Sequence, residues 1–155
     1  MSFPTPPKSI LAVCLGNICR SPTMEAVLRS KAARVGLALE VDSAGTAGYH
    51  VGSPPDHRAV RHGAQRRYDL TGLRARTVCA QDFERFDLIL AADGANLRDL
   101  RKICPSQHLH KLHLFLGSDP LPDPYHGDSS DFDHVLDLVE ERAETLLRVW
   151  QQSPP

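Results

Sequence analysis

The residues with the clearest chemical potential lie near the N-terminus, in the run CLGNICRSP that spans residues 14–22. An apolar run precedes it and an amphipathic stretch follows it, so this order predicts a strand, a tight loop and a helix. We expect Ser21 to cap the helix and Pro22 to occupy its first position. The loop N–H groups, the helix dipole and the Arg20 guanidinium then surround a space that suits a tetrahedral oxyanion, with Cys14 at its base. The spacing therefore predicts a phosphate site in which a thiolate attacks phosphorus.

Each residue type in this run suits that chemistry. A helix N-terminus and a neighbouring arginine both favour the thiolate form of a cysteine, which is the nucleophilic form. Arg20 can bind two phosphate oxygens at once, and backbone N–H groups can complete the cradle. The predicted phosphate-binding residues are Leu15, Gly16, Asn17, Ile18, Cys19, Arg20 and Ser21. The competing interpretation is a buried structural cysteine beside an ordinary helix cap.

Together with segments further along the chain, residues 13–22 make the sequence resemble the low-molecular-weight protein tyrosine phosphatase family. The similarity runs from about Ser9 to Trp150. The matching segments, in the family's order, are DSAGT (42–46), YHVG (49–52), DFERFD (82–87), NLRDL (96–100) and DPY (123–125). The resemblance implies a metal-independent enzyme that hydrolyses phosphotyrosine and aryl phosphate monoesters through a phosphocysteine, with no cofactor. Its partner would be a phosphotyrosine-containing protein.

The proton for the leaving group must come from elsewhere in the chain. Asp123 lies in the proline-rich run LPDPYHG, residues 121–127, where a lone aspartate is usually a turn residue. The resemblance implies more, because the family's general acid stands in this Asp-Pro-Tyr setting. Asp123 would protonate the leaving oxygen and then activate the water that breaks the phosphocysteine. Asp119 and Asp128 are the nearest competitors.

The resemblance also assigns the walls of the site. In the family, aromatic side chains wall a deep slot that holds the phosphotyrosine ring, and Tyr49 and Tyr125 stand at those positions. His126 stands where a second tyrosine is frequent, and Tyr49 stands where tryptophan is common. Both changes make the entrance more polar, so we expect a shifted or broadened substrate preference.

Asn17 and Ser43 are expected to support the loop from outside. In the family, the loop asparagine has a strained backbone and is held by hydrogen bonds from a serine and a histidine. Leu73 stands at that histidine position, so a water or another residue such as His50 would have to replace it. Cys19 is either a small buried hydrophobe or, as in the family, a redox partner that traps oxidised Cys14 as a disulfide.

Two other functions compete with the phosphatase interpretation. An arsenate reductase can use the same fold and nucleophile, but it needs resolving cysteines, for which Cys79 and Cys104 are poorly placed. A non-catalytic module that binds phosphorylated partners would not need Cys14, Arg20 and Asp123 together.

Composition limits the partners and the compartment. The 155 residues include 18 basic and 19 acidic ones, a net charge of −1 that gives no general attraction to nucleic acid. No apolar run approaches the length of about 20 residues that spans a bilayer, and residues 1–7 do not resemble a signal peptide. We therefore expect a cytoplasmic protein with reduced thiols, acting as a monomer or weak dimer without membrane insertion.

Strands and helices alternate along the chain, which predicts one α/β domain at residues 8–150, with flexible ends at 1–7 and 151–155. The expected architecture is a four-stranded parallel sheet with helices on both faces, like flavodoxin, and with the ligand at the carboxyl ends of the strands. The expected strands are 9–14, 39–43, 87–92 and 111–116. The expected helices are 22–35, 56–66, 82–86, 96–103 and 132–150.

Overall fold

Four parallel strands run through the centre of the structure, a computed structural model that describes residues 6–152. Their order across the sheet is β2-β1-β3-β4. The strands are β1 (Ser9–Cys14), β2 (Glu40–Gly45), β3 (Leu88–Ala91) and β4 (Leu112–Leu114). Cys14 pairs with Gly45 in the last register position of β1 and β2, so the predicted nucleophile stands at the carboxyl edge of the sheet.

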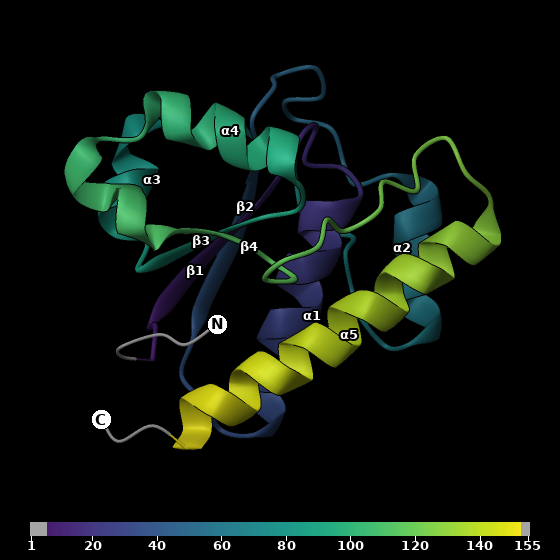
Figure 1. Cartoon of the computed structure of the whole chain (residues 1–155). Helices are drawn as coiled ribbons and strands as arrows, with labels where there is room; N and C mark the ends of the chain where they lie inside the picture. Colours follow the sequence, from purple (N-terminus) through teal and green to yellow (C-terminus); the bar gives the residue numbers. More distant parts are fainter. Residues whose placement is uncertain (1–5, 153–155) are drawn as a thin grey trace.

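Helices cover both faces of this sheet, as predicted (Figure 1). Helices α1 and α5 pack side by side on one face, and α3 and α4 lie over the other. The helices are α1 (Arg20–Arg34), α2 (His57–Gln65), α3 (Ala80–Arg85), α4 (Gly94–Ile103) and α5 (Ser129–Gln152), with a short 3₁₀ helix, η1, at Ser106–Lys111.

The alternation of side chains along β1 divides the core between the two faces. Ile10 and Ala12 pack with α1 and α5, whereas Leu11 and Val13 pack with α3 and α4. All four are completely buried. Because β1 is covered on both faces, it reads as a continuous apolar run rather than an alternating one.

The prediction that Ser21 caps the first helix is wrong. α1 begins at Arg20, with Cys19 in the capping position and no side-chain capping bond. The Ser21 hydroxyl instead contacts the Cys14 sulfur, so it is not available to the helix N–H groups. Pro22 is tolerated at the third helical position, because N–H groups in a first helical turn have no partner to lose.

The other elements agree with expectation to within a few residues. β4 is shorter than the predicted strand 111–116, because η1 occupies the chain up to Lys111 and a turn begins directly after Leu114. α5 begins three residues earlier than predicted, where the Asp128 carboxylate accepts from the Ser130 N–H at 3.0 Å. The predicted flexible ends fall mostly on residues 1–5 and 153–155, outside the described residues, while 151–152 form the end of α5. Between residues 6 and 152, no helix combines the length and apolar character needed to cross a bilayer.

Candidate active site

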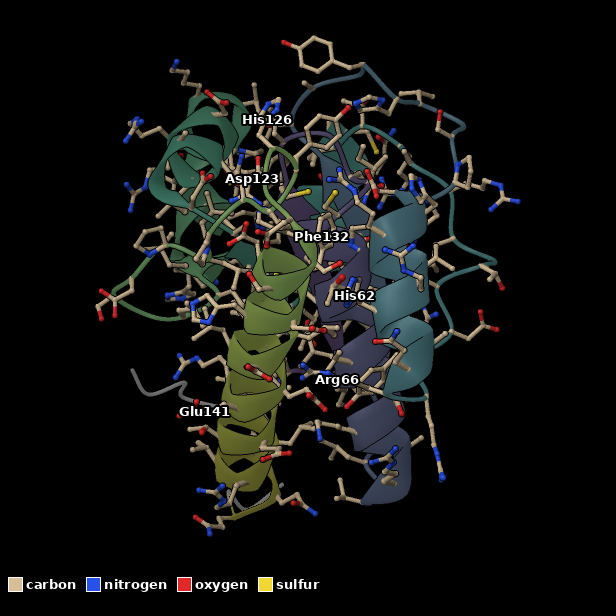
Figure 2. The ribbon with its side chains drawn as sticks, turned by 90° about the vertical axis from the view of Figure 1, so that its right-hand side faces the viewer. His62, Arg66, Asp123, His126, Phe132 and Glu141 are labelled. Carbon is tan, nitrogen blue, oxygen red and sulfur yellow. The ribbon has the colours of Figure 1, made fainter. Side chains whose placement is uncertain are left out.

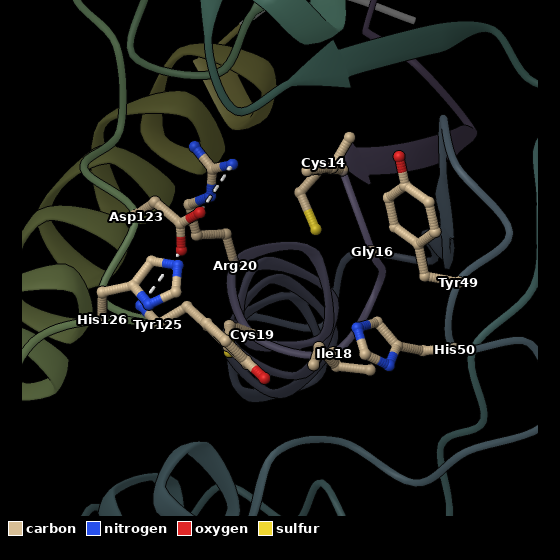
Figure 3. A pocket seen from close by; sticks show the side chains of 11 residues that line it. Cys14, Gly16, Ile18, Cys19, Arg20, Tyr49, His50, Asp123, Tyr125 and His126 are labelled. Atoms are coloured by element: carbon tan, nitrogen blue, oxygen red, sulfur yellow. Dashed lines mark hydrogen bonds and ion pairs between the residues drawn. The ribbon is translucent and has the colours of Figure 1, made fainter.

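The loop between β1 and α1, residues 14–20, forms the base of a cavity at the carboxyl edge of the sheet (Figure 3). The Cys14 sulfur lies 3.1 Å from the Ser21 hydroxyl oxygen and accepts from the Asn17 N–H at 3.3 Å. It also faces the N-terminus of the 15-residue helix α1. Hydrogen-bond donors and a helix dipole aimed at sulfur stabilise a thiolate. We call residues 14–20 the Cys14 loop.

Asn17 gives the Cys14 loop its curl. Its φ of 58° is a left-handed backbone conformation, uncommon outside glycine. The side chain holds it there by donating to Ser21 Oγ at 2.7 Å and to Ser43 Oγ at 3.0 Å, while its own oxygen accepts from the Arg76 N–H at 3.0 Å. The predicted contact between Asn17 and Ser43 is therefore present.

Within residues 6–152, the partners of the Asn17 side chain do not include His50, and Glu25 supports Asn17 indirectly, through Ser43. The Ser43 hydroxyl donates to the Glu25 carboxylate at 2.6 Å, and Arg29 pairs with the other oxygen. Burial raises the pKa of the Glu25 carboxyl, although the Ser43 hydrogen bond and the Arg29 charge oppose that shift. His50 lies instead at the cavity wall, and Leu73 packs against the apolar core.

Arg20 is fixed by two partners and reaches a third. Its Nη1 donates to the Asp93 carboxylate at 2.8 Å and to the Leu121 carbonyl at 3.0 Å. Its Nη2 lies 3.7 Å from the Asp123 carboxylate. Arg20 is only 3% exposed and is held by these partners, so the orientation of its guanidinium is set before any anion binds.

Asp93 is a functional residue that sequence analysis missed. It follows β3 and caps α4 by accepting from the Asn96 N–H at 2.8 Å. Burial would raise the pKa of the Asp93 carboxyl, but the hydrogen bonds from Asn96 and Arg20 hold it below its ordinary value. A signal was available, because Asp93 follows the strand that neighbours β1, at the same edge of the sheet.

Asp123 comes to the same cavity from a distant part of the chain. It lies in the Asp123 loop, which we define as residues 115–128, between β4 and α5. One carboxylate oxygen accepts from the Tyr125 N–H at 3.1 Å, and the other faces Arg20. The carboxyl is about half exposed, so it can exchange protons with solvent.

The walls of the cavity carry the predicted aromatic pair (Figure 3). Tyr125 stands edge-on to His126 at 4.9 Å between ring centroids, and Tyr49 stands edge-on to His50 at 6.5 Å. Tyr49 is 78% exposed, so its ring is free to meet a substrate. His50 is a wall residue that sequence analysis placed elsewhere. The lining residues are Cys14, Leu15, Gly16, Ile18, Cys19, Arg20, Tyr49, His50, Asp123, Tyr125 and His126.

The remaining cysteines occupy different environments. Cys19 lines the cavity and is buried, and this burial, with the nearby Asp56 charge, raises the pKa of its thiol well above the ordinary range. Cys79 is exposed at the start of α3, and Cys104 follows α4. Neither is among the residues that line the Cys14 cavity.

A buried thiol at the base of an anion cradle, with a fixed arginine and a carboxyl above it, defines the class of phosphatases that form a covalent phosphocysteine. The sequence profile described as "Low molecular weight phosphotyrosine protein phosphatase" matches residues 9–153. The chain therefore belongs to the low molecular weight phosphotyrosine protein phosphatase family. It is a protein tyrosine phosphatase by this membership.

Relatives from distant organisms support the assignment over nearly the whole chain. The low molecular weight phosphotyrosine protein phosphatase of Homo sapiens is 41% identical over 145 residues, covering 83% of this chain and 86% of that protein. YfkJ of Bacillus subtilis, named a low molecular weight protein-tyrosine-phosphatase, is 38% identical over 148 residues, covering 90% and 93%. The crystal structure of a protein tyrosine phosphatase from Entamoeba histolytica superimposes with a TM-score of 0.89 at 36% identity, covering 93% and 97%.

Proposed function

We propose that this protein dephosphorylates phosphotyrosine in cytoplasmic proteins, and aryl phosphates in general, without a metal ion. Cys14 is the nucleophile, Arg20 binds the phosphoryl group and Asp123 is the general acid. The observation that carries these roles is one cavity lined by the thiol, the guanidinium and the carboxyl, although they come from two ends of the chain. The Arg20 guanidinium also pairs with the Asp123 carboxylate at 3.7 Å.

In the first step the Cys14 thiolate attacks phosphorus, and the bond from phosphorus to the aryl oxygen breaks. The Asp123 carboxyl gives its proton to the departing phenolate, which leaves as a neutral phenol. Arg20 and the N–H groups of residues 15–20 neutralise the equatorial phosphoryl oxygens as the charge builds. Tyr49 and Tyr125 hold the aromatic ring of the substrate, and His126 adds a polar edge.

In the second step the roles of the acid reverse. The Asp123 carboxylate takes a proton from water, and the resulting oxygen attacks phosphorus. The bond between sulfur and phosphorus breaks, which returns the Cys14 thiolate and releases inorganic phosphate. The Ser21 hydroxyl, 3.1 Å from the sulfur, stabilises the thiolate as it leaves.

Cys19 is proposed as the partner for reversible oxidation. A sulfenic acid formed on Cys14 by peroxide would condense with the Cys19 thiol, releasing water and forming a disulfide. The raised pKa of the Cys19 thiol keeps it protonated in the resting enzyme, so it does not compete with Cys14 for phosphate. We propose a monomer or weak dimer as the working form.

The first experiment is hydrolysis of p-nitrophenyl phosphate and a phosphotyrosine peptide in EDTA, with wild type beside Cys14→Ser. Wild type is expected to turn over both substrates, while the variant loses at least about 10³-fold in kcat, because the nucleophile is gone. The variant should still bind vanadate or phosphate, since Arg20 and the loop N–H groups remain. Turnover by Cys14→Ser, or loss of wild-type turnover in EDTA, would contradict the proposal. Thioredoxin-dependent arsenate reduction that Cys79→Ser abolishes would favour the reductase instead.

A further inference from the structure

The first half of the Asp123 loop, up to Leu121, is anchored to the sheet and to Arg20. The Leu121 N–H donates to the Ala92 carbonyl at 2.8 Å, and the Leu121 carbonyl accepts from Arg20. Leu121 is buried, but Asp123 and Tyr125 beyond it are exposed. General acid catalysis needs the carboxyl within hydrogen-bond reach of the leaving oxygen, so something must hold this second half of the loop in place.

Arg58, near the start of α2, makes that connection. Its Nη2 donates to the Tyr125 carbonyl at 2.8 Å, and its Nη1 donates to the Gly127 carbonyl at 3.4 Å. The guanidinium also lies over the Tyr125 ring, 5.6 Å from the centroid, and over the Phe132 ring at 4.6 Å. Phe132 is 4% exposed and belongs to the first turn of α5, so Arg58 is stacked between a fixed ring and a wall of the cavity.

Asp56 fixes Arg58 in turn. Its two carboxylate oxygens accept from Nε and Nη2 of Arg58, each at 3.0 Å, in the fork geometry that suits arginine. Those hydrogen bonds are the main reason that the pKa of the Asp56 carboxyl is lowered, so the carboxylate stays charged. Asp56 also caps α2 and donates its own N–H to the Ile18 carbonyl at 2.8 Å, in the Cys14 loop.

These contacts form a continuous bridge between the two halves of the active site. It runs from Ile18 through Asp56 and Arg58 to the carbonyl groups of Tyr125 and Gly127, which follow Asp123 in the loop. Figure 2 shows this side of the molecule, with Asp123 and His126 above the start of α5 and Phe132 and His62 below them. Arg58 does not line the cavity, so it acts on the reaction only through the loop that it holds.

We propose that Arg58 is a positioning residue that sets the Asp123 carboxyl and the Tyr125 ring relative to the Cys14 sulfur. It thereby governs activity on aryl phosphates with poor leaving groups, the class that includes phosphotyrosine. This role rests on the proposed function, because it requires Asp123 to be the general acid. A substrate whose phenolate leaves readily needs little help from the acid and therefore depends little on Arg58.

The test compares kcat/KM for phenyl phosphate, a poor leaving group, with kcat/KM for p-nitrophenyl phosphate, a good one. Arg58→Gln is expected to lower kcat/KM about tenfold or more for phenyl phosphate and less than threefold for p-nitrophenyl phosphate. General acid catalysis contributes about 10²–10⁴-fold to a rate, and a displaced acid loses part of that contribution. Arg58→Lys, which keeps the charge but not the fork, should fall between. The inhibition constant of vanadate should stay within twofold of wild type, since Arg20 and the Cys14 loop are intact. Arg61→Gln, an exposed change on the same helix, is the matched control and should leave both rates unchanged.

Asp123→Asn separates this proposal from the assignment of the acid. If that variant selectively loses phenyl phosphate hydrolysis and Arg58→Gln does not, Arg58 has no positioning role. If Asp123→Asn loses both substrates equally, the acid assignment and the role of Arg58 both fail. In the double variant, Arg58→Gln is expected to cause less than a twofold further loss on phenyl phosphate, because no acid remains to position. An additive loss would overturn the proposal, as would equal loss of both substrates by Arg58→Gln in a protein that melts like wild type.

Discussion

A short chain of side-chain hydrogen bonds decides whether the Cys14 loop keeps its shape. Asn17 donates to Ser43, and Ser43 donates to the buried carboxylate of Glu25. Glu25 is 2% exposed and also paired with Arg29, so the Ser43 hydroxyl donates to a buried acceptor that is itself held in place. Glu25, on α1, thus supports the strained Asn17 backbone through Ser43. This support is present in a chain that has Leu73 where the family has a histidine.

Ser43→Ala tests this chain at its middle member. The change leaves Asn17 and Glu25 each without one hydrogen-bond partner. The loss of the neutral hydrogen bond to Asn17 lowers the stability by about 1 kcal/mol, and the loss at the Glu25 carboxylate lowers it by more. We expect phosphate to inhibit the variant about five- to tenfold more weakly, because the loop N–H groups lose their alignment. Steady-state inhibition by inorganic phosphate measures this directly. Ser130→Ala, whose hydroxyl contacts Asp128 at the exposed start of α5, is the control and should bind phosphate like wild type.

Several polar contacts, which the sequence did not suggest, join helix α2 and the residues just after it to α5. His62 pairs with Asp133 at 2.8 Å, and Arg66 pairs with Glu140 at 2.6 Å (Figure 2). Just beyond α2, the buried Tyr68 hydroxyl donates to the same Glu140 carboxylate at 2.6 Å. Burial and the hydrogen bond to Glu140 raise the pKa of the Tyr68 phenol above its ordinary value, so the hydroxyl stays protonated and donates at neutral pH. These contacts fix the helix that carries Arg58.

Tyr68→Phe is expected to loosen α2 without emptying space in the core. It removes one charge-assisted hydrogen bond, a loss of about 1.5 kcal/mol, which corresponds to a fall in melting temperature of about 3–6 °C for a domain of this size. Thermal unfolding followed by circular dichroism gives the shift. Glu141→Gln, an exposed change one residue further along α5, should leave the melting temperature unchanged. An equal shift in both variants would mean that the contact to Glu140 adds nothing specific.

Across the whole molecule, the features that could be predicted from the sequence are those that depend on residues close together in the chain. The run at residues 14–22 specifies its strand, loop and helix within one stretch, and alternation of apolar segments specifies the parallel sheet. Asp93 carries a partial signal, because it follows a predicted strand, but its pairing with Arg20 could not be predicted in this way, nor could the positions of Glu25 and Arg58 in the site. Their partners lie 73, 18 and 67 residues away, and only the folded sheet brings such pairs together. Tyr49, Tyr125 and Asp123 were assigned by family resemblance, since nothing in their local sequence distinguishes them from turn residues.

Carboxyl groups that pair with residues distant in the sequence also make the free energy of unfolding depend on pH in the acid range. Burial opposes ionisation of the Asp82 and Asp93 carboxyls, but the hydrogen bonds from Arg76 to Asp82 and from Asn96 and Arg20 to Asp93 outweigh it, so both pKa values lie below the ordinary 3.8. Carboxyls of this kind stabilise the fold fully above the pKa of the unfolded chain, and their contribution is lost as pH falls through the lower folded pKa. Glu25 acts in the opposite sense: its raised pKa means that its contribution is greatest below 4.5 and declines as pH rises through the folded value.

Asp82→Asn should therefore lower the free energy of unfolding at neutral pH and make it depend less on pH in the acid range. Asp82 binds Arg76 through two contacts of 3.0 Å, and the Arg76 N–H holds Asn17 in the Cys14 loop, so the loss reaches the active site as well. We expect the free energy of unfolding at pH 7 to fall by about 2 kcal/mol, and its further drop between pH 5 and pH 3 to be smaller than in wild type. Urea unfolding at a series of pH values measures both quantities. Asp87→Asn, at an exposed carboxyl whose neighbour Lys8 contributes only a backbone N–H, is the control and should retain most of the wild-type acid response. A parallel pH dependence in wild type and Asp82→Asn would show that the pairing of Asp82 with Arg76 is not what ties stability to acid.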